Sequence, residues 1–166
     1  MGTRKHFRPE REQLATEWSQ LAAYIDGEGC IIITHSPAKD KPHWNPHFSL
    51  VVQVTNSDMR LLVWCKKTFG GFITNKKRKV CKALGKRPLF HWHVVSGDAE
   101  WVLRNCLPYF IIKKEQAEVG IAFRESFPTV KYGKGYRVPS NVIEYRKTLK
   151  SKLSELKQSV PDIDTA

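Results

Sequence analysis

LAAYIDGEG, residues 21–29, ends an apolar helical stretch on two glycines and holds two carboxylates at that end. Upstream, apolar residues recur at steps of three and four, which predicts an amphipathic helix starting near Glu10. Its stripe is Leu14, Trp18, Leu21, Ala22 and Ile25. Gly27 and Gly29 predict the helix C-terminus. A helix end that offers carboxylates and backbone carbonyls can bind a divalent metal.

The rest of the chain alternates between strand and helix patterns. Period-two alternation predicts strands, and spacing of three to four predicts helices. Strands are expected over residues 30–36, 47–55, 72–79 and 87–95, and further helices over 59–69, 99–107, 113–126 and 140–158. Asn56, Ser57 or Asp58 can cap the second helix. The order α-β-β-α-β-β-α-α-α predicts an α+β fold, with residues 1–9 as a flexible basic arm and residues 10–166 as a single domain.

The charge balance points to a polyanionic partner. The chain has 166 residues, with 28 Lys and Arg against 16 Asp and Glu, a formal net charge of +12. A globular domain this basic usually binds nucleic acid. The alternative is a basic surface that serves only solubility, but the excess is clustered, for example in Lys76-Lys77-Arg78-Lys79 and Lys113-Lys114. Clustering favours a nucleic-acid surface.

Cysteine usage and hydropathy suggest an intracellular, reducing compartment such as the cytoplasm, nucleoid or an organelle matrix. The four cysteines, at positions 30, 65, 81 and 106, form no CxxC pair, so neither a zinc ribbon nor a disulfide framework is indicated. No apolar run follows the basic N-terminus, and none is long enough to span a bilayer. We therefore expect no secretory signal and no membrane partner.

The nonapeptide resembles the motif of the LAGLIDADG homing endonucleases. Three further features strengthen the resemblance: the strand 48–56 with its Gln-Val-Thr ending, Arg60 shortly after it, and PYFIIKKEQA at 108–117. These resemble segments of the homodimeric algal-intron members, and one motif per chain is the pattern of that subgroup. The resemblance implies an αββαββα core with a saddle-like four-stranded antiparallel sheet and extra C-terminal helices. The chain departs from the family at Ala23, where Gly is usual, at Glu28, where many members have Asp, and at Asn56, where Gln is found.

The motif suggests a metal site shared between two copies. Glu28 supplies a hard carboxylate oxygen and Gly27 a backbone carbonyl at a helix end, a donor set that suits Mg²⁺ or Mn²⁺. Asp26 is expected to brace the helix end instead. Small residues allow two such helices to approach closely, and the expected dimer interface is Leu21, Ala22, Ala23 and Ile25.

Two further residues are candidates for catalysis. The resemblance implies that Lys113 lies beside the scissile phosphate and orders the solvent there. Asn56 can position the attacking water by hydrogen bonds, or it can serve as a helix N-cap, and the sequence leaves both open.

DNA recognition is expected on the polar face of the sheet, because an antiparallel sheet can present alternate residues to base edges in the major groove. Strand parity selects Thr34, Ser36, His47, Ser49, Gln53, Thr55, Thr74, Lys76, Arg78, Arg87, His91 and His93. Some of them can be merely exposed or contact phosphates. The histidines are interpreted as facing DNA, since no acid or cysteine at matching spacing completes a metal cluster.

These observations favour a Mg²⁺-dependent, homodimeric, site-specific DNA endonuclease. It would cut a long pseudo-palindromic site in double-stranded DNA across the minor groove, leave 3′ overhangs and promote the mobility of its intron. The alternative is an intron maturase or DNA-binding regulator with the same fold and no cleavage activity, with intron RNA as a possible partner. A basic RNA- or ribosome-binding protein with a chance motif ranks last.

Overall fold

The computed structural model describes residues 12–37, 45–75, 88–128 and 136–158. The elements are α1 (Ala15–Glu28), β1 (Gly29–Ser36), β2 (His47–Asn56), α2 (Met59–Phe69), β3 (Phe72–Asn75), β4 (Phe90–Val95), α3 (Ser96–Cys106), the 3-10 helix η2 (Leu107–Tyr109), α4 (Lys114–Glu125) and α5 (Ser140–Gln158). The predicted element order is confirmed. Among the described helices, none is long and apolar enough to cross a membrane. The arm predicted over residues 1–9 lies outside the described part of the chain.

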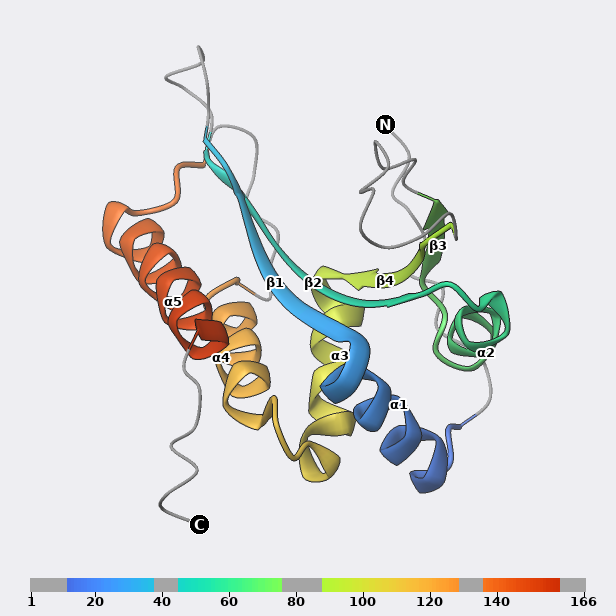
Figure 1. Cartoon of the computed structure of the whole chain (residues 1–166). Helices are drawn as coiled ribbons and strands as arrows, with labels where there is room; N and C mark the ends of the chain where they lie inside the picture. Colours follow the sequence, from blue (N-terminus) through green and yellow to red (C-terminus); the bar gives the residue numbers. More distant parts are fainter. Residues whose placement is uncertain (1–11, 38–44, 76–87, 129–135, 159–166) are drawn as a thin grey trace.

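The four strands form one antiparallel sheet in the order β1-β2-β4-β3. Gly29 pairs with Val54 at one end of the β1–β2 ladder, and Ser36 pairs with His47 at the other. Figure 1 shows the sheet as strongly curved, with α1, α3, α4 and α5 gathered on one side of it. The predicted α+β class with a four-stranded antiparallel sheet is therefore confirmed.

One hydrophobic core lies between the sheet and the helices. Alternate strand residues point into it and are almost fully buried, as strand alternation requires: Ile31, Ile33, Leu50, Val52, Val54, Trp92 and Val94. The stripe of α1 enters the same core with Trp18, Leu21, Ala22 and Ile25. Helix α4 packs closely at Gly120, where an added Cβ would lie 2.9 Å from Leu103 Cδ1 and 3.2 Å from Leu50 Cδ1.

Hydrogen bonds at the helix N-termini explain where the boundaries differ from the predicted ones. Helix α1 begins at Ala15 rather than near Glu10, because the Glu17 carboxylate accepts a hydrogen bond from the Leu14 N–H at 2.9 Å. For α2 the cap is Asp58, whose side chain accepts from the Arg60 N–H at 2.9 Å. Apolar periodicity carries no information about these local polar contacts.

The edge of the sheet is described only in part. Strand β3 is described from Phe72 to Asn75 and β4 from Phe90 to Val95. The remainder of the predicted third strand and the start of the fourth fall in residues 76–87, outside the described residues. Helix α3 starts directly after β4 at Ser96, three residues before the predicted start, with Ser96 at φ 53°.

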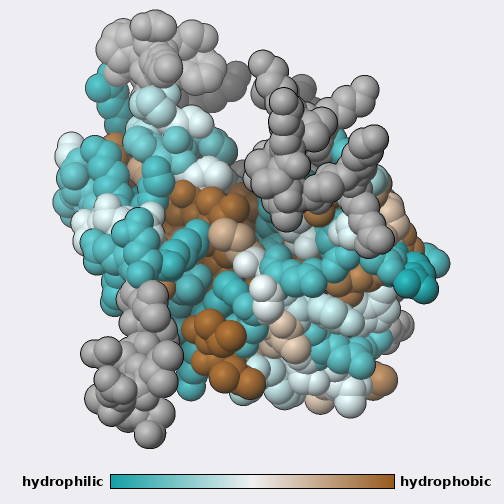
Figure 2. Space-filling model, in the orientation of Figure 1, coloured by the Kyte–Doolittle hydropathy of each residue, from teal (hydrophilic) through white to brown (hydrophobic). Residues whose placement is uncertain are grey.

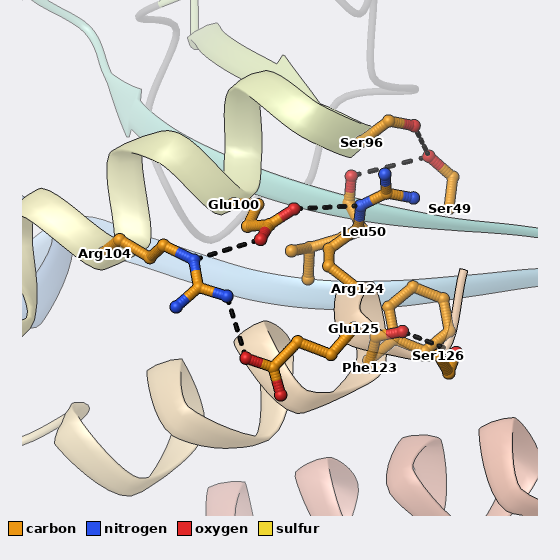
Figure 3. Close-up of polar contacts among 9 residues, drawn as sticks. All are labelled: Ser49, Leu50, Ser96, Glu100, Arg104, Phe123, Arg124, Glu125 and Ser126. Carbon is orange, nitrogen blue, oxygen red and sulfur yellow. Dashed lines mark hydrogen bonds and ion pairs between the residues drawn. The ribbon is translucent and has the colours of Figure 1, made fainter. Parts of the chain in front are cut away.

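Ion pairs join the exposed sides of α3 and α4 (Figure 3). Glu100 lies 3.0 Å from Arg104 Nε and 3.6 Å from Arg124 Nε, and Arg104 also reaches Glu125 at 2.8 Å. Arg104 is 48% exposed, and its pairs with Glu100 and Glu125 contribute roughly 0–1 kcal/mol each. Their effect is to hold the register of two helices whose packing already depends on the apolar core.

We predict that Gly29→Ala destabilises the fold. An added Cβ would lie 2.6 Å from Ile25 Cα and 2.7 Å from the Ile25 carbonyl oxygen, so the backbone itself must shift. The expected loss in the free energy of unfolding is about 1–3 kcal/mol, measured by urea denaturation. Gly97→Ala is the matched control, because a Cβ there meets nothing within 4 Å. Equal effects of the two substitutions would contradict this account.

Candidate active site and nucleic-acid interface

One carboxylate fastens the C-terminal end of α1 to the segment before α4. Asp26, only 8% exposed, accepts hydrogen bonds from the N–H groups of Ile111 at 2.8 Å, Ile112 at 3.2 Å and Lys113 at 2.9 Å. Both carboxylate oxygens take part in these charge-assisted bonds. The predicted bracing role of Asp26 is therefore confirmed.

Lys113 is held at the same helix end. Its ammonium group donates a hydrogen bond to the backbone carbonyl of Asp26. Burial lowers the pKa of Lys113, while the nearby Asp26 carboxylate acts in the opposite direction. The structure thus places Lys113 beside the end of the motif helix, where the family resemblance had placed it. Its contact with a scissile phosphate stays a prediction.

Asn56 links Glu28 to the start of α2. Its side-chain N–H donates to the Glu28 carboxylate, and its Oδ1 accepts from the Asp58 N–H at 2.7 Å. With both arms of the amide engaged, Asn56 orients the exposed Glu28 carboxylate. The N-cap interpretation of Asn56 is wrong, because Asp58 caps α2.

The oxygen donors at the end of α1 fit a hard divalent cation whose coordination shell would be completed by substrate. Glu28 and Gly27 are both exposed at the end of α1, and the last carbonyls of a helix have no partner within it. The residues that the structure describes contain no group of three or more His, Cys, Asp or Glu that could hold a metal. One carboxylate plus carbonyl and phosphate oxygens is the kind of site that Mg²⁺ accepts.

The predicted dimer residues do not share a surface. Leu21, Ala22 and Ile25 are 0% exposed because they form the core side of α1, so they cannot contact a second copy. The expectation for these three is wrong: a helix buries its apolar stripe within its own domain first. Ala23 is exposed on the other side of the helix, as are Gly27 and Glu28.

The polar sheet face contains every described residue that strand parity selected. In the ladders Thr34 pairs with Ser49, Ser36 with His47, Thr55 with His91, Gln53 with His93 and Thr74 with His91. They alternate with the buried positions and so face away from the helices. Lys76, Arg78 and Arg87 lie outside the described residues.

Several members of this face are engaged in hydrogen bonds within the chain. His91 is only 7% exposed, and its Nδ1 contacts Thr55 Oγ1 at 2.8 Å and Gln53 Nε2 at 3.1 Å. The expectation that His91 itself reads bases is therefore corrected. Ser49 is half-buried, and its hydroxyl lies 3.1 Å from the Ser96 hydroxyl. Parity identifies the face of a residue, whereas burial depends on its neighbours across the sheet.

Sequence reasoning missed two isoleucines beside the site. Ile111 and Ile112 are 90% and 70% exposed, the highest exposures among the large hydrophobic side chains described. Figure 2 shows that brown, hydrophobic surface is exposed on the face of the molecule that it draws. Two consecutive isoleucines are typical of a hydrophobic core. The only signal that they are exposed was their position between Pro108 and the next helix.

We predict that Asp26→Asn weakens the link to residues 111–113. One acceptor oxygen becomes an amide N–H that faces backbone donors, and an unsatisfied buried group costs about 1–3 kcal/mol. Urea denaturation should report this loss, and amide hydrogen exchange should accelerate at residues 111–113. Glu115→Gln, an exposed change in the first turn of α4, is the control. Unchanged exchange at these amides would contradict the bracing role.

Comparisons with known proteins agree with this geometry. Residues 21–87 match the family described as LAGLIDADG endonuclease. No curated protein gives a significant match to the chain. The homing endonuclease I-CvuI, solved in complex with a DNA target in the presence of Ca, is similar with a TM-score of 0.69 and 18% identity, over 89% of this chain and 85% of that chain.

Two other solved structures share the fold. The archaeal intron-encoded homing endonuclease I-Vdi141I, complexed with DNA, has a TM-score of 0.65 and 15% identity over 91% of this chain and 89% of that chain. I-SmaMI bound to cleaved DNA has a TM-score of 0.66 and 18% identity, over 92% of this chain but 49% of that chain. The family match over residues 21–87, which is less than half of the chain, and the shared fold make this chain similar to the LAGLIDADG endonucleases.

Proposed function

We propose that this chain is a site-specific DNA endonuclease that needs a divalent cation and acts as a homodimer. The observation that carries the proposal is the constellation at the end of α1. There an exposed Glu28 carboxylate is hydrogen-bonded by Asn56, and Lys113 is held at the same helix end by Asp26. The similarity to DNA-bound homing endonucleases supports the same function.

The site's own residues have separate roles in this proposal. Glu28, with the carbonyl of Gly27, would hold the cation, and Asn56 keeps the carboxylate aimed outward. The cation, Mg²⁺ or Mn²⁺, would activate water and offset charge on the phosphate. Lys113 supplies a positive charge near the scissile phosphate, and partial burial of its side chain limits screening by solvent.

A second copy would complete the site. The carboxylate of Glu28 is one ligand per chain, and cutting both strands of a duplex needs two such centres. Gly27 also suggests a partner: an added Cβ there meets nothing within 4 Å inside the chain, although glycine in a helix costs roughly 0.5–1 kcal/mol relative to alanine. Close approach of a helix from a second copy would explain why position 27 is a glycine. Ala23 lies on the same exposed side, and Ile111 and Ile112 would be covered beside it.

The DNA would lie along the polar face of the sheet. The net charge of +12 favours a polyanion, and Gln53, His47 and Thr34 are among the partly exposed polar residues there. Two sheets related by a two-fold axis imply a pseudo-palindromic site on the order of two helical turns long. Cleavage across the minor groove with 3′ overhangs, and mobility of a host intron, belong to this proposal through the family resemblance.

We predict that Glu28→Gln abolishes cleavage and preserves binding. A bound metal contributes several kcal/mol to the transition state, so the cleavage rate should fall by about 10²-fold or more. Target duplexes are first selected from a random library in Mg²⁺, and binding is then measured in Ca²⁺. Glu155→Gln, an exposed change on α5, should cut normally. A wild type that binds a defined duplex but never cuts it would support the non-cutting regulator or maturase instead.

We predict that Ile112→Glu dissociates the homodimer. A carboxylate would have to be desolvated in the interface, so the dimer dissociation constant should rise by about ten-fold or more, measured by sedimentation velocity. Tyr145→Glu is the control, since Tyr145 is 49% exposed on α5. A wild type that remains a monomer on DNA would overturn the shared site.

A further inference from the structure

A row of apolar side chains crosses the otherwise polar face of the sheet. Ile32 on β1 pairs with Val51 on β2, and Val51 pairs with Val95 on β4, so three β-branched residues lie side by side across three strands. Residues directly opposite each other in an antiparallel ladder project from the same face of the sheet. Their neighbours Ile31 and Val52 are fully buried on the helix side. The row therefore lies on the face that the proposed function assigns to DNA.

The hydrophobic core does not account for this row. All three side chains are partly exposed, and none is among the described residues that form the core or pack against it. A preference for the strand conformation does not require them either, because threonine has that preference and carries a hydroxyl group. Polar residues are accommodated on the same face of β2, at Ser49 and Thr55. The row is thus an apolar surface that internal packing leaves partly open.

Polar side chains border the row on both sides. Thr34 and Ser49 form the next pair toward the β1–β2 loop. Toward the active site, the next pair is Gln53 and His93. A duplex that lies on this face would therefore meet hydrogen-bonding side chains on either side of the row, and only aliphatic groups within it.

Among the base edges of the major groove, one group matches an aliphatic surface. All four bases present hydrogen-bond donors or acceptors there, and thymine also presents its 5-methyl group. An amino or carbonyl group pressed against aliphatic side chains loses water without gaining a hydrogen bond, which is unfavourable. A methyl group in the same place loses no hydrogen bond and gains from burial. The row therefore favours a thymine over the other bases.

We propose, building on the proposed function, that Val51 recognises a thymine in each half-site through the 5-methyl group of the base. Val51 is the central member of the row and the specificity-determining residue, and Ile32 and Val95 extend the apolar surface on either side of it. Recognition depends on the methyl group rather than on a hydrogen-bonding pattern. Uracil should therefore fail to replace thymine, and 5-methylcytosine should be preferred to cytosine.

The first test changes the DNA and keeps the protein unchanged. Target duplexes are selected from a random library, and binding of the full-length protein is measured in Ca²⁺. Deoxyuridine then replaces each thymine in turn, which removes the methyl group and keeps every hydrogen-bonding group. At one position in each half-site, the affinity should fall roughly four-fold, as expected for one buried methyl group. At that position, 5-methylcytosine should bind tighter than cytosine by a similar factor. Equal affinity for every deoxyuridine duplex overturns the proposal.

Variants of the protein identify the side chain responsible. Val51→Ala should reduce the preference for thymine over deoxyuridine to below about two-fold at this one position, whereas Val51→Ile should keep it. Val63→Ala truncates a partly exposed valine on α2 and is the matched control, which should keep the full preference. Thermal unfolding confirms that each variant is folded. An unchanged preference in folded Val51→Ala overturns the proposal, and the deoxyuridine series tests it on the wild type alone.

Failure of this proposal is distinguishable from failure of the proposed function. A wild type that binds no duplex removes both proposals. A wild type that binds and cuts a selected duplex, with no sensitivity to any thymine methyl group, removes only the role of Val51.

Discussion

The contact between Asp26 and the N–H groups of residues 111–113 is the constraint on which the rest of the site depends. A helix C-terminus carries partial negative charge, so a buried carboxylate there is unfavourable unless donors surround it. Three backbone N–H groups donate to the carboxylate, and the Lys113 ammonium group donates to the backbone carbonyl of Asp26. The same bonds place Lys113 at the end of α1 and hold Ile111 and Ile112 exposed beside it. The buried Asp26 thus positions both Lys113, a candidate for catalysis, and the exposed Ile111 and Ile112.

The two acids and two glycines of the motif have different physical roles. Asp26 is buried and structural, whereas Glu28 is exposed and held by Asn56. Gly29 is required inside the chain, because any Cβ would collide with the backbone of Ile25. Gly27 has open space around it, so packing within the described chain does not require a glycine there. Within this short motif, Asp26 and Gly29 are required by the fold, whereas Gly27 and Glu28 are exposed at the end of the helix.

Much of this could be predicted from the pattern, and the failures have a common cause. Strand parity identified the polar face correctly, because side chains alternate strictly along a strand. It could not show that His91 is buried against Gln53 and Thr55, since that depends on cross-strand neighbours. Helical periodicity found the stripe of α1 but assigned Leu21 and Ile25 to a dimer. Helical periodicity shows which residues are buried, but it does not show whether their own domain or a second copy of the chain covers them.

The sequence by itself determined the order of elements, the position of the motif at a helix end and the faces of the strands. These follow from local periodicity and from glycine and capping chemistry, which act over a few residues. Only the tertiary structure decided that Asp26 binds a segment 85 residues away, that Asn56 contacts Glu28, and that His91 is buried against Gln53 and Thr55. Hydrogen bonds between distant side chains depend on how the elements pack, and no spacing along the chain encodes that distance.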